Sequence, residues 1–462
     1  MVVKVLVVGG GPGGYVAALR AAQLGAEVTV VEKKALGGTC LNVGCVPTKV
    51  LLNTTGLYQA IAGGKRLGLK AEGLTVDWPA LQKRRKQIVR RLVTGVGFLL
   101  RKANCEVVTG AARLTSKNSI VVTADGNETM ELTADKIILA TGSEPVQLPL
   151  PGLDLPEVIY SDAALALTEI PKSMLIIGGG VIGVELASVY QALGTKCIIV
   201  EMLPRILPSM DGELAEGIGK SLSSLKVDIY TSAQVLRCQP AAEGVTVKVR
   251  TADGELQFTV NKVLAAVGRR PATSRLGLEE AGIEMDGPRI AVNEYLETSV
   301  PGIYAVGDAV GGDMLAHTAY TEGSIAADNA LGNKKPMNYT AVPACIYTRP
   351  EAASVGLTEK QALEAGHKIK VGRFPLIANS KALIKNVDGF MKVIANDRYG
   401  EILGVHILGP DATELISEAA LAIRMEATVE ELAANIHPHP SVSEALGEAA
   451  LATDKIALHI PN

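Results

Sequence analysis

Two cysteines near the N-terminus are the residues best suited to chemistry. Cys40 and Cys45 lie in the segment GGTCLNVGCVPTK, residues 37–49. A dithiol that can close a small ring beside a redox cofactor can take electrons from a thiol substrate and pass them on as a pair. Residues five positions apart lie about 140° apart around an ideal α-helix, so the two sulfurs can meet only across a distorted turn, which Gly44 and Pro47 can supply. The alternative is a pair of unrelated buried thiols.

A histidine near the C-terminus fits the base that such chemistry needs. Thiol–disulfide exchange requires a proton acceptor whose pKa is near the working pH, and His439 can fill that role. Glu444 can hold its imidazole and stabilise the charged form. However, residues 441–444 (SVSE) also form a capping box, in which Glu444 merely closes a helix start, and the local sequence does not decide between the two. The spacing of the six histidines predicts no metal site.

A dinucleotide-binding pattern precedes the cysteines. An apolar run over residues 2–8 predicts a strand, the glycine-rich residues 9–14 predict a turn, and residues 15–24 predict a helix. A second apolar run, 26–31, ends in Glu32. The glycines allow close approach to a pyrophosphate, the helix start offers free N–H groups, and Glu32 can accept hydrogen bonds from ribose hydroxyls.

The same pattern returns in residues 174–201. Residues 174–177 predict the strand, 178–183 (GGGVIG) predict the turn, and residues from about 184 to 193 predict a helix. A second predicted strand, 196–200, is followed by Glu201. The interval from first glycine to terminal acid is 23 residues in both copies, which predicts two bound dinucleotides. Glu201 would repel a 2′-phosphate and accept from a free 2′-hydroxyl, so NAD is favoured over NADP at the second site. Arg205 is the nearest cation that could offset this preference.

Further predicted strands also end at glycines. Strands at 136–139, 263–267 and 298–306 are followed by Thr141-Gly142-Ser143, Gly268 and Gly307-Asp308, respectively. Ligands of open α/β sheets bind at the carboxyl ends of strands, so we expect these ends to border the nucleotide crevices. Asp308 can accept hydrogen bonds from the sugar-alcohol chain of a flavin, although a turn aspartate or helix cap is equally consistent with the local sequence.

The residues from about 341 onward show a different pattern. Predicted strands at 344–347, 370–375, 389–396 and 402–408 are combined with predicted helices at 359–365, 414–424 and 428–435, without a phosphate loop. We therefore predict an α/β protein with two Rossmann-like dinucleotide-binding domains and a C-terminal α+β domain. The predicted boundaries are 1–145 and 270–340 for the two parts of the first domain, 146–269 for the second and 341–462 for the third.

The length, net charge and apolar runs of the chain limit the class of protein. A chain of 462 residues is expected to form about three domains. A net charge of −3 gives no electrostatic signature of binding to nucleic acid or to an anionic membrane, and no apolar run approaches the ~18 residues that cross a bilayer. We expect a cytoplasmic protein, or an organelle-matrix protein whose transit peptide has been removed. Four more cysteines are expected to be buried in the protein interior: Cys105, Cys197, Cys238 and Cys345. Because these cysteines form no disulfide framework, we expect the protein to work in a reducing compartment.

A basic cluster lies outside these motifs. Residues 83–86, 90–91 and 101–102 are all Lys or Arg, and they surround leucine and isoleucine residues at helical spacing. The favoured interpretation is the solvated face of an amphipathic helix, and the alternative is a surface on which a partner docks.

Together these motifs resemble one family, the flavoprotein disulfide reductases with two dinucleotide folds, and most closely its branch that oxidises dihydrolipoyl groups. The match includes both glycine patterns, the cysteine segment, the GRRP run at 268–271, residues 298–308 and the tail HPHPSVSE at 437–444. The resemblance implies FAD on the first fold, NAD on the second and a homodimer formed through the C-terminal domain. It also implies oxidation of protein-bound dihydrolipoamide, with the lipoyl domains of 2-oxoacid dehydrogenase acyltransferases or the glycine-cleavage lipoyl protein as partners.

The resemblance also assigns roles to individual residues. It implies that Cys40 exchanges with the substrate sulfur, that Cys45 contacts the flavin, and that Lys49 lies near the flavin and pairs with Glu185 of the second fold. His439 would be the base, supplied by the other subunit. The residues implied to contact the nucleotides are Gly9, Gly11, Pro12, Gly13, Gly14, Glu32, Lys33, Gly38, Thr39, Lys49, Gly110, Ala112, Thr141, Gly142, Ser143, Asp308, Ala316, Gly178, Gly180, Val181, Ile182, Gly183, Glu201, Val235, Ala266, Gly268 and Arg270.

Two other functions fit parts of the pattern. One is a reductase of the same family for glutathione or mercuric ion. Glutathione enzymes usually favour NADP, which Glu201 opposes, and mercuric reductases carry a C-terminal cysteine pair, which residues 458–462 lack. The other is a flavin-binding structural or sensory subunit, which would leave Cys40, Cys45 and His439 without a role.

Overall fold

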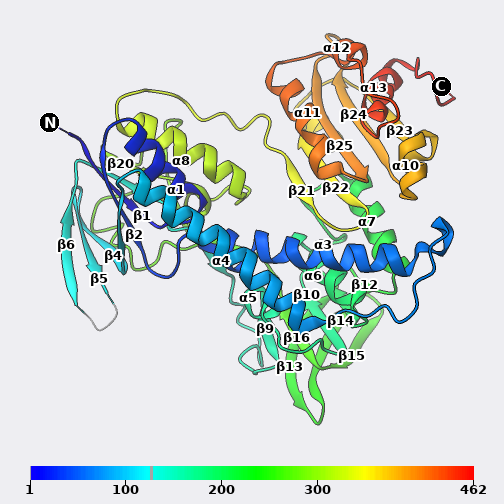
Figure 1. The fold of residues 1–462 in the computed structure, drawn as a ribbon, viewed down its shortest axis with the longest axis horizontal. Helices are drawn as coiled ribbons and strands as arrows, with labels where there is room; N and C mark the ends of the chain where they lie inside the picture. The colour runs from blue at the N-terminus through cyan, green and yellow to red at the C-terminus, as the bar shows by residue number, and fades with distance from the viewer. Residues whose placement is uncertain (1, 125–127, 462) are drawn as a thin grey trace.

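The protein is built from three layered bodies (Figure 1). The computed structural model describes residues 2–124 and 128–461. The N-terminus lies in the first body and the C-terminus in the third, at opposite ends of the molecule. No helix in these two stretches combines the length and the apolarity that crossing a bilayer requires.

The first body is an open parallel sheet. Its strands, in spatial order, are β20 (Ile303–Ala305), β7 (Lys136–Leu139), β1 (Lys4–Val8), β2 (Glu27–Glu32) and β3 (Glu106–Thr109). Residues 5–8 of β1 are all buried, because both faces of a parallel sheet are covered. Val5 pairs with Val28 on one side and with Lys136 on the other, parallel in both cases. The turns after β1, β2, β7 and β20 therefore meet at one edge of the sheet.

Helices and smaller sheets complete the first body. Helix α1 begins with Pro12, whose missing N–H costs nothing at that position, and packs against α8. The helices are α1 (Pro12–Gln23), α2 (Gly38–Val43), α3 (Cys45–Ala62), η1 (Gly64–Leu67), α4 (Trp78–Lys102), η2 (Gly307–Val310) and α8 (Ala316–Ala330). The remaining strands are β4 (Ala111–Ser116), β5 (Ser119–Thr123), β6 (Thr129–Thr133), β8 (Ser143–Pro145), β17 (Arg269–Pro271), β18 (Met285–Asp286) and β19 (Arg289–Ile290).

The second body repeats the first architecture. Its parallel sheet has the order β12 (Asp228–Tyr230), β11 (Lys196–Val200), β10 (Ser173–Ile177), β16 (Lys262–Ala265) and β9 (Val158–Tyr160). The helices are α5 (Ser161–Leu165), α6 (Val181–Ala192) and α7 (Gly212–Ser224). An antiparallel sheet of β13 (Gln234–Ala241), β14 (Gly244–Thr251) and β15 (Gly254–Val260) lies beside it.

The third body is a mixed unit around an antiparallel sheet. The spatial order is β21 (Ala344–Ile346), β22 (Glu351–Gly356), β25 (Ile402–Gly409), β24 (Phe390–Asn396) and β23 (Ile369–Pro375). Successive residues of a strand face opposite sides, and Ala353 packs in the core of this body while Ala352 packs in the core of the second. The helices are α9 (Glu359–Glu364), η3 (Leu376–Ala378), α10 (Ser380–Lys385), α11 (Ala412–Arg424), α12 (Val429–Ala434), α13 (Glu444–Leu451) and η4 (Ala452–Asp454).

A charge cluster joins the second and third bodies. Lys392 of β24 is only 1% exposed, and its Nζ lies 3.1 Å from Asp211, 2.7 Å from Glu213 and 2.9 Å from Glu359. Arg373 of β23 also binds Glu213, at 2.8 Å, and this pairing lowers the pKa of Glu213 to about 2. A buried ammonium is tolerated only when it is paired, so the cluster ties α7 to the C-terminal sheet.

Most of the predicted elements are observed with bounds that differ by a few residues. Strands at 136–139 and 196–200 are observed with the predicted bounds. The strand predicted at 298–306 is reduced to Ile303–Ala305, because the preceding residues form turns closed by local hydrogen bonds. Three of the four remaining cysteines are buried, whereas Cys345 is only partly buried.

Candidate functional site

The cysteine pair lies at a break between two helices. Cys40 is in α2, Cys45 is the first residue of α3, and Gly44 between them has φ −139° and ψ −108°. A Cβ at Gly44 would lie 3.1 Å from the carbonyl oxygen of Thr39, so the break is tightly packed. Gly44 therefore supplies the predicted distortion. Pro47 does not, because it lies within the first turn of α3, where a proline is compatible with the helix.

The two thiols interact with each other. A hydrogen bond from Cys40 lowers the pKa of Cys45 to about 7, and the positive charge of Lys49 acts in the same direction. The same hydrogen bond, together with burial, raises the pKa of Cys40. Cys40 is buried and Cys45 is exposed. The thiol at the start of α3 is thus the more acidic of the two.

A buried ion pair links the first fold to the second. Lys49 of α3 lies 2.9 Å from Glu185 of α6, whose side chain is buried. Glu185 also accepts a hydrogen bond of 3.0 Å from the backbone N–H of Tyr347, and the Lys49 ammonium lies 4.5 Å from the centre of the Tyr347 ring. The structure thus brings Lys49 and Glu185 together, 136 residues apart in sequence.

The turn after β1 and the start of α1, residues 9–14, form a tightly packed nucleotide cradle. Gly9 has φ +105°, and a Cβ at Gly14 would lie 1.8 Å from the carbonyl oxygen of Gly9. The Glu32 carboxylate accepts hydrogen bonds of 2.7 Å from the N–H groups of Gly10 and Lys34. Each carboxylate oxygen keeps a free lone pair, so Glu32 can still accept from a ribose hydroxyl. Only glycine permits this approach of helix to strand.

The turn after β10 repeats that geometry. Gly178 also has φ +105°, and a Cβ at Gly183 would lie 2.2 Å from the carbonyl oxygen of Gly178. Glu201 accepts from the N–H groups of Gly179, at 2.6 Å, and Leu203, at 2.8 Å. The Arg205 guanidinium donates to the carbonyls of residues 208 and 210 instead of pairing with Glu201. The charge of Glu201 thus remains available against a 2′-phosphate.

Polar groups converge where β7 and β20 end. Asp308 accepts a hydrogen bond from the Ser143 hydroxyl, and Arg269 donates to Ser143 Oγ and to its carbonyl, both at 2.7 Å. Arg269 also reaches Thr39 beside the cysteines, at 3.3 Å. The sequence analysis missed Arg269 and named its neighbour Arg270. Adjacent strand residues face opposite sides, so only one of the two arginines can face the crevice, but the sequence does not reveal which one.

Two buried hydroxyls fit a polar ligand. Among the described residues, Thr141 Oγ1 and Thr318 Oγ1 are buried and have no hydrogen-bond partner. Buried polar atoms are nearly always paired, so an orphaned hydroxyl beside the glycine turn indicates a polar ligand. With the cradle after β1, the Glu32 carboxylate and Asp308, these donors and acceptors fit FAD. The second cradle, with Glu201, fits NAD.

Most of the other residues predicted to contact a nucleotide lie near the carboxyl edges of the two parallel sheets. Gly38 and Thr39 begin α2, Gly110 lies between β3 and β4, and Ala316 begins α8. In the first body Gly11, Pro12, Gly13, Lys33, Ala112 and Gly142 also lie in or beside the turns at the carboxyl edge. In the second body Gly180 is the N-cap of α6, Val181 and Ile182 lie in the first turn of that helix, Ala266 and Gly268 follow β16, and Val235 lies in β13. Whether each contacts a nucleotide remains a prediction.

His439 and Glu444 form a pair in the third body. His439 Nδ1 lies 2.8 Å from Glu444 Oε1, and Glu444 Oε2 accepts from the Ser441 N–H at 2.8 Å. Burial would raise the pKa of Glu444, but these hydrogen bonds outweigh it and lower the pKa. The side chain of Ser441 contacts Ser443 instead of the helix backbone, so no complete capping box forms. Glu444 thus holds the imidazole and the preceding chain at the same time.

Within one chain, the helix that follows His439 lies apart from the helices that carry the cysteines. Helix α13 packs against α12, β23 and β24 at the outer part of the third body, whereas α3 lies below that body (Figure 1). The His439 side chain is 75% exposed. The structure therefore presents the imidazole outward, where a second chain can meet it.

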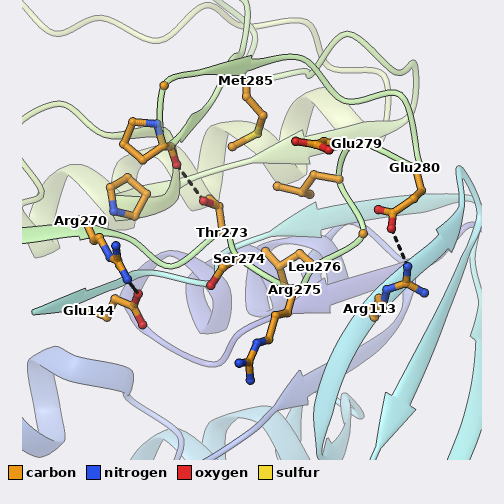
Figure 2. A pocket seen from close by; sticks show the side chains of 15 residues that line it. Arg113, Glu144, Arg270, Thr273, Ser274, Arg275, Leu276, Glu279, Glu280 and Met285 are labelled. Atoms are coloured by element: carbon orange, nitrogen blue, oxygen red, sulfur yellow. Dashed lines mark hydrogen bonds and ion pairs between the residues drawn. The ribbon is translucent and has the colours of Figure 1, made fainter. Parts of the chain in front are cut away.

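A pocket of about 500 Å³ lies elsewhere (Figure 2). It is lined by the segment 270–288 together with Arg113 and Glu144. Arg270 forms an ion pair of 2.8 Å with Glu144, and Arg113 forms one of 2.7 Å with Glu280. Neither cysteine nor His439 lines this pocket, so it is separate from the candidate site. No cluster of three or more His, Cys, Asp or Glu suited to a metal ion occurs in residues 2–124 and 128–461.

The chain is similar to known proteins along nearly its whole length. It is 41% identical to the dihydrolipoyl dehydrogenase of Bacillus subtilis (strain 168) over 468 residues, covering 98% of each chain. It is 42% identical to dihydrolipoyl dehydrogenase 1, mitochondrial, of Arabidopsis thaliana over 463 residues, covering 99% of this chain and 91% of the other. The crystal structure of LpdA from Mycobacterium tuberculosis matches with a TM-score of 0.90 at 29% identity, covering 97% of this chain and 99% of that one.

The family models cover the three bodies. Residues 3–323 match the pyridine nucleotide-disulphide oxidoreductase model, and residues 342–450 match the dimerisation domain of the same family. The second match supports the predicted homodimer. Proteins of this family use FAD and NAD, in agreement with the two cradles. By its sequence, its fold and its two nucleotide cradles, the chain belongs to the pyridine nucleotide-disulphide oxidoreductase family.

Proposed function

We propose that the protein is a dihydrolipoyl dehydrogenase, which oxidises protein-bound dihydrolipoamide to lipoamide and reduces NAD. The observation that carries the proposal is the placement of Cys40 and Cys45 on the two sides of the Gly44 break, in two helices, the first of which begins against the first nucleotide cradle. FAD bound in that cradle supplies a two-electron couple between the dithiol and NAD. The relatives in Bacillus subtilis and Arabidopsis thaliana bear the name of this activity.

The family resemblance assigns the order of attack, with Cys40 exchanging with the substrate sulfur, and the direction of the two thiol pKa shifts supports that order. Breaking the Cys40–Cys45 disulfide requires one sulfur to leave as a thiolate, and the thiol of lower pKa leaves faster. The pKa of Cys45 is lowered to about 7, whereas that of Cys40 is raised. A substrate thiolate therefore attacks Cys40 Sγ and Cys45 departs. The second substrate thiol then attacks the mixed disulfide, Cys40 leaves, and the lipoyl ring closes as the dithiol takes up the two electrons.

Each attacking thiol must lose a proton, and His439 is the proposed acceptor. Its Nδ1 is held by Glu444, which leaves Nε2 free to take the proton and stabilises the imidazolium that results. We propose that His439 acts on the cysteines of the partner subunit, since the fold separates the two within one chain. Lys49 and Glu185 hold the cysteine helix against the second fold, which positions the two nucleotide cradles relative to each other.

We also propose the class of protein that carries the dihydrolipoyl substrate. Candidate substrates are the lipoyl domains of 2-oxoacid dehydrogenase acyltransferases and the lipoyl protein of glycine cleavage. For the nicotinamide, the charge of Glu201 supports NAD over NADP.

Steady-state kinetics with several substrates test the activity. The purified protein should oxidise dihydrolipoamide with NAD at a rate at least about tenfold above that with NADP. Reduction of glutathione disulfide by either nicotinamide should be negligible. Efficient glutathione disulfide reduction without dihydrolipoamide oxidation would instead place the protein in another branch of the family.

Hybrid dimers test the placement of His439. One chain carries Cys45→Ser and the other His439→Gln. If the histidine acts across the interface, one site of the hybrid has both native residues and about half of the wild-type activity returns. If it acts within its own chain, both sites are defective and the hybrid is as inactive as its parents.

A further inference from the structure

Helix α4 carries a strongly basic face. Its 25 residues contain eight cations and no acid: Lys83, Arg84, Arg85, Lys86, Arg90, Arg91, Arg101 and Lys102. Only Arg85 is buried, where it donates to Gln82 at 2.7 Å. None of the other seven forms an ion pair or a side-chain hydrogen bond with any residue that the structure describes. This helix is strongly positive in a chain whose net charge is −3.

The seven exposed cations share one side of the helix. At about 100° per residue they fall within an arc of about 160°. Lys83 and Lys86 are three positions apart and Lys86 and Arg90 four apart, so like charges face each other and weaken the helix. A helix face that is merely solvated usually mixes signs and gains from ion pairs. A local arrangement that opposes folding without compensation indicates a function.

The opposite side of α4 packs on the cysteine segment. Val96 and Leu100 belong to the same apolar core as Cys40, and α4 contacts both α2 and α3. On the outside, Phe98 is exposed within the basic arc and Leu99 is exposed beside it. Figure 1 shows α4 crossing the front of the molecule, with no other element over it in that view. The basic strip from residue 83 to 102 is about 29 Å long, which is close to the diameter of a small domain.

We propose that the exposed face of α4 is a docking surface for an acidic protein domain that carries the dihydrolipoyl group to the cysteines. This inference rests on the proposed function and names the chemistry of its partner. A negatively charged domain is steered to this strip and held close to α2 and α3. A small acidic domain fits better than a long polyanion, which the net negative charge of the rest of the chain would repel.

The test compares a protein-borne substrate with a free one. Arg84→Glu/Arg91→Glu reverses two cations of the strip. Lys117→Glu/Lys172→Glu makes the same change in charge at two exposed lysines elsewhere and serves as the matched control. The kcat/KM of each protein is measured at low and high salt with a lipoylated domain of net negative charge in its dihydro form, and with free dihydrolipoamide.

We expect the α4 variant to lose at least about tenfold in kcat/KM for the lipoylated domain at low salt. Its kcat/KM for free dihydrolipoamide should stay within about twofold of wild type, and the control should match wild type with both substrates. High salt should reduce the difference in kcat/KM for the lipoylated domain between wild type and the α4 variant. An unchanged rate with the lipoylated domain, or an equal loss with both substrates, would overturn the proposal. A wild-type protein inactive with free dihydrolipoamide would refute the proposed function itself.

An anionic membrane is the competing partner for such a strip. Binding to phosphatidylglycerol vesicles is measured for the same variants. Binding that depends on Arg84 and Arg91, together with an unaffected rate on the lipoylated domain, would assign the strip to a membrane and overturn the proposal.

Discussion

The two nucleotide folds have the same glycine turn and the same acid after the second strand. In both, the first glycine has φ +105°. In both, the acid 23 residues later accepts from the N–H of the second glycine, at 2.7 Å for Glu32 and 2.6 Å for Glu201. The last glycine of each motif lies against the first, so closely that a Cβ would overlap its carbonyl oxygen. Nucleotide binding therefore accounts for the features that the two folds share.

The folds differ in the segment after the second strand. After β2 the chain enters α2 and α3, which carry Cys40 and Cys45. After β11 it enters a loop that ends at α7, whose N-cap Asp211 belongs to the charge cluster with Lys392. The first connection carries the two cysteines that we propose to be redox-active, and the second carries an attachment to the C-terminal body. The redox function was thus added in the connection and not in the nucleotide fold.

The largest effect should come from the glycines that both folds share. In Gly14→Val the new side chain overlaps the Gly9 carbonyl, where even a Cβ would lie at 1.8 Å, so the protein should lose bound flavin and fold poorly. In Gly183→Val flavin should remain, while NAD affinity falls by at least about 100-fold. Flavin absorbance and NAD titration measure the two losses. Gly56→Ala, where no atom lies within 4 Å of the new Cβ, should leave both unchanged. Equal flavin loss in both valine variants would show that the two cradles do not bind separate nucleotides.

A second contrast concerns the cysteines of the two folds. Cys45→Ser should lower dihydrolipoamide turnover by at least about a thousandfold with flavin still bound, because the disulfide can no longer form. Cys197→Ser in β11 of the second fold should retain activity. Cys197 is buried, and burial raises its pKa to about 12, so its thiol is unreactive. Comparable activity losses in the two variants would mean that the chemistry is not confined to the first connection.

The acid of the second fold should govern the choice of nicotinamide. Glu201→Gln can satisfy only one of the two N–H groups that the carboxylate now binds. The KM for NAD should rise by about 10- to 100-fold, since hydrogen bonds to a charged group contribute about 1.5–3 kcal/mol. The ratio of kcat/KM with NAD to kcat/KM with NADP should decrease, because the negative charge that repels a 2′-phosphate is lost. Kinetics with both nicotinamides check this, and an unaltered ratio would show that Glu201 does not set the preference.

The smallest effect is a shift in thiol acidity. Alkylation of the reduced protein by iodoacetamide should increase with pH around a midpoint of about 7, because Cys45 becomes a thiolate as the pH rises through its pKa. Cys40→Ala removes the hydrogen bond that lowers this pKa, so the midpoint should move upward and the rate at neutral pH should fall. A wild-type midpoint near the ordinary value of 9.0 would show that the two thiols do not interact.

Much of this organisation is visible in the residues alone. The glycine turns, the acids that come after them and the apolar strands are local patterns, and they predicted β7 and β11 with their observed bounds. The strand β22 was missed, because its sequence EAASVG is short and only weakly apolar. Arg269 was missed because a run of two arginines does not reveal which one faces the crevice. Lys49 and Glu185 were paired only through the family resemblance.

Residue types and their spacing specify the local chemistry: two thiols across a glycine, two nucleotide turns, and a histidine beside a carboxylate. These features depend on near neighbours along the chain, so they can be identified without the fold. The packing of separate segments is what brings Lys49 to Glu185, Arg269 to Ser143 and Thr39, and Lys392 to Asp211 and Glu213. Such contacts depend on how separate segments pack against each other, and that packing is set by many weak interactions spread over the whole chain.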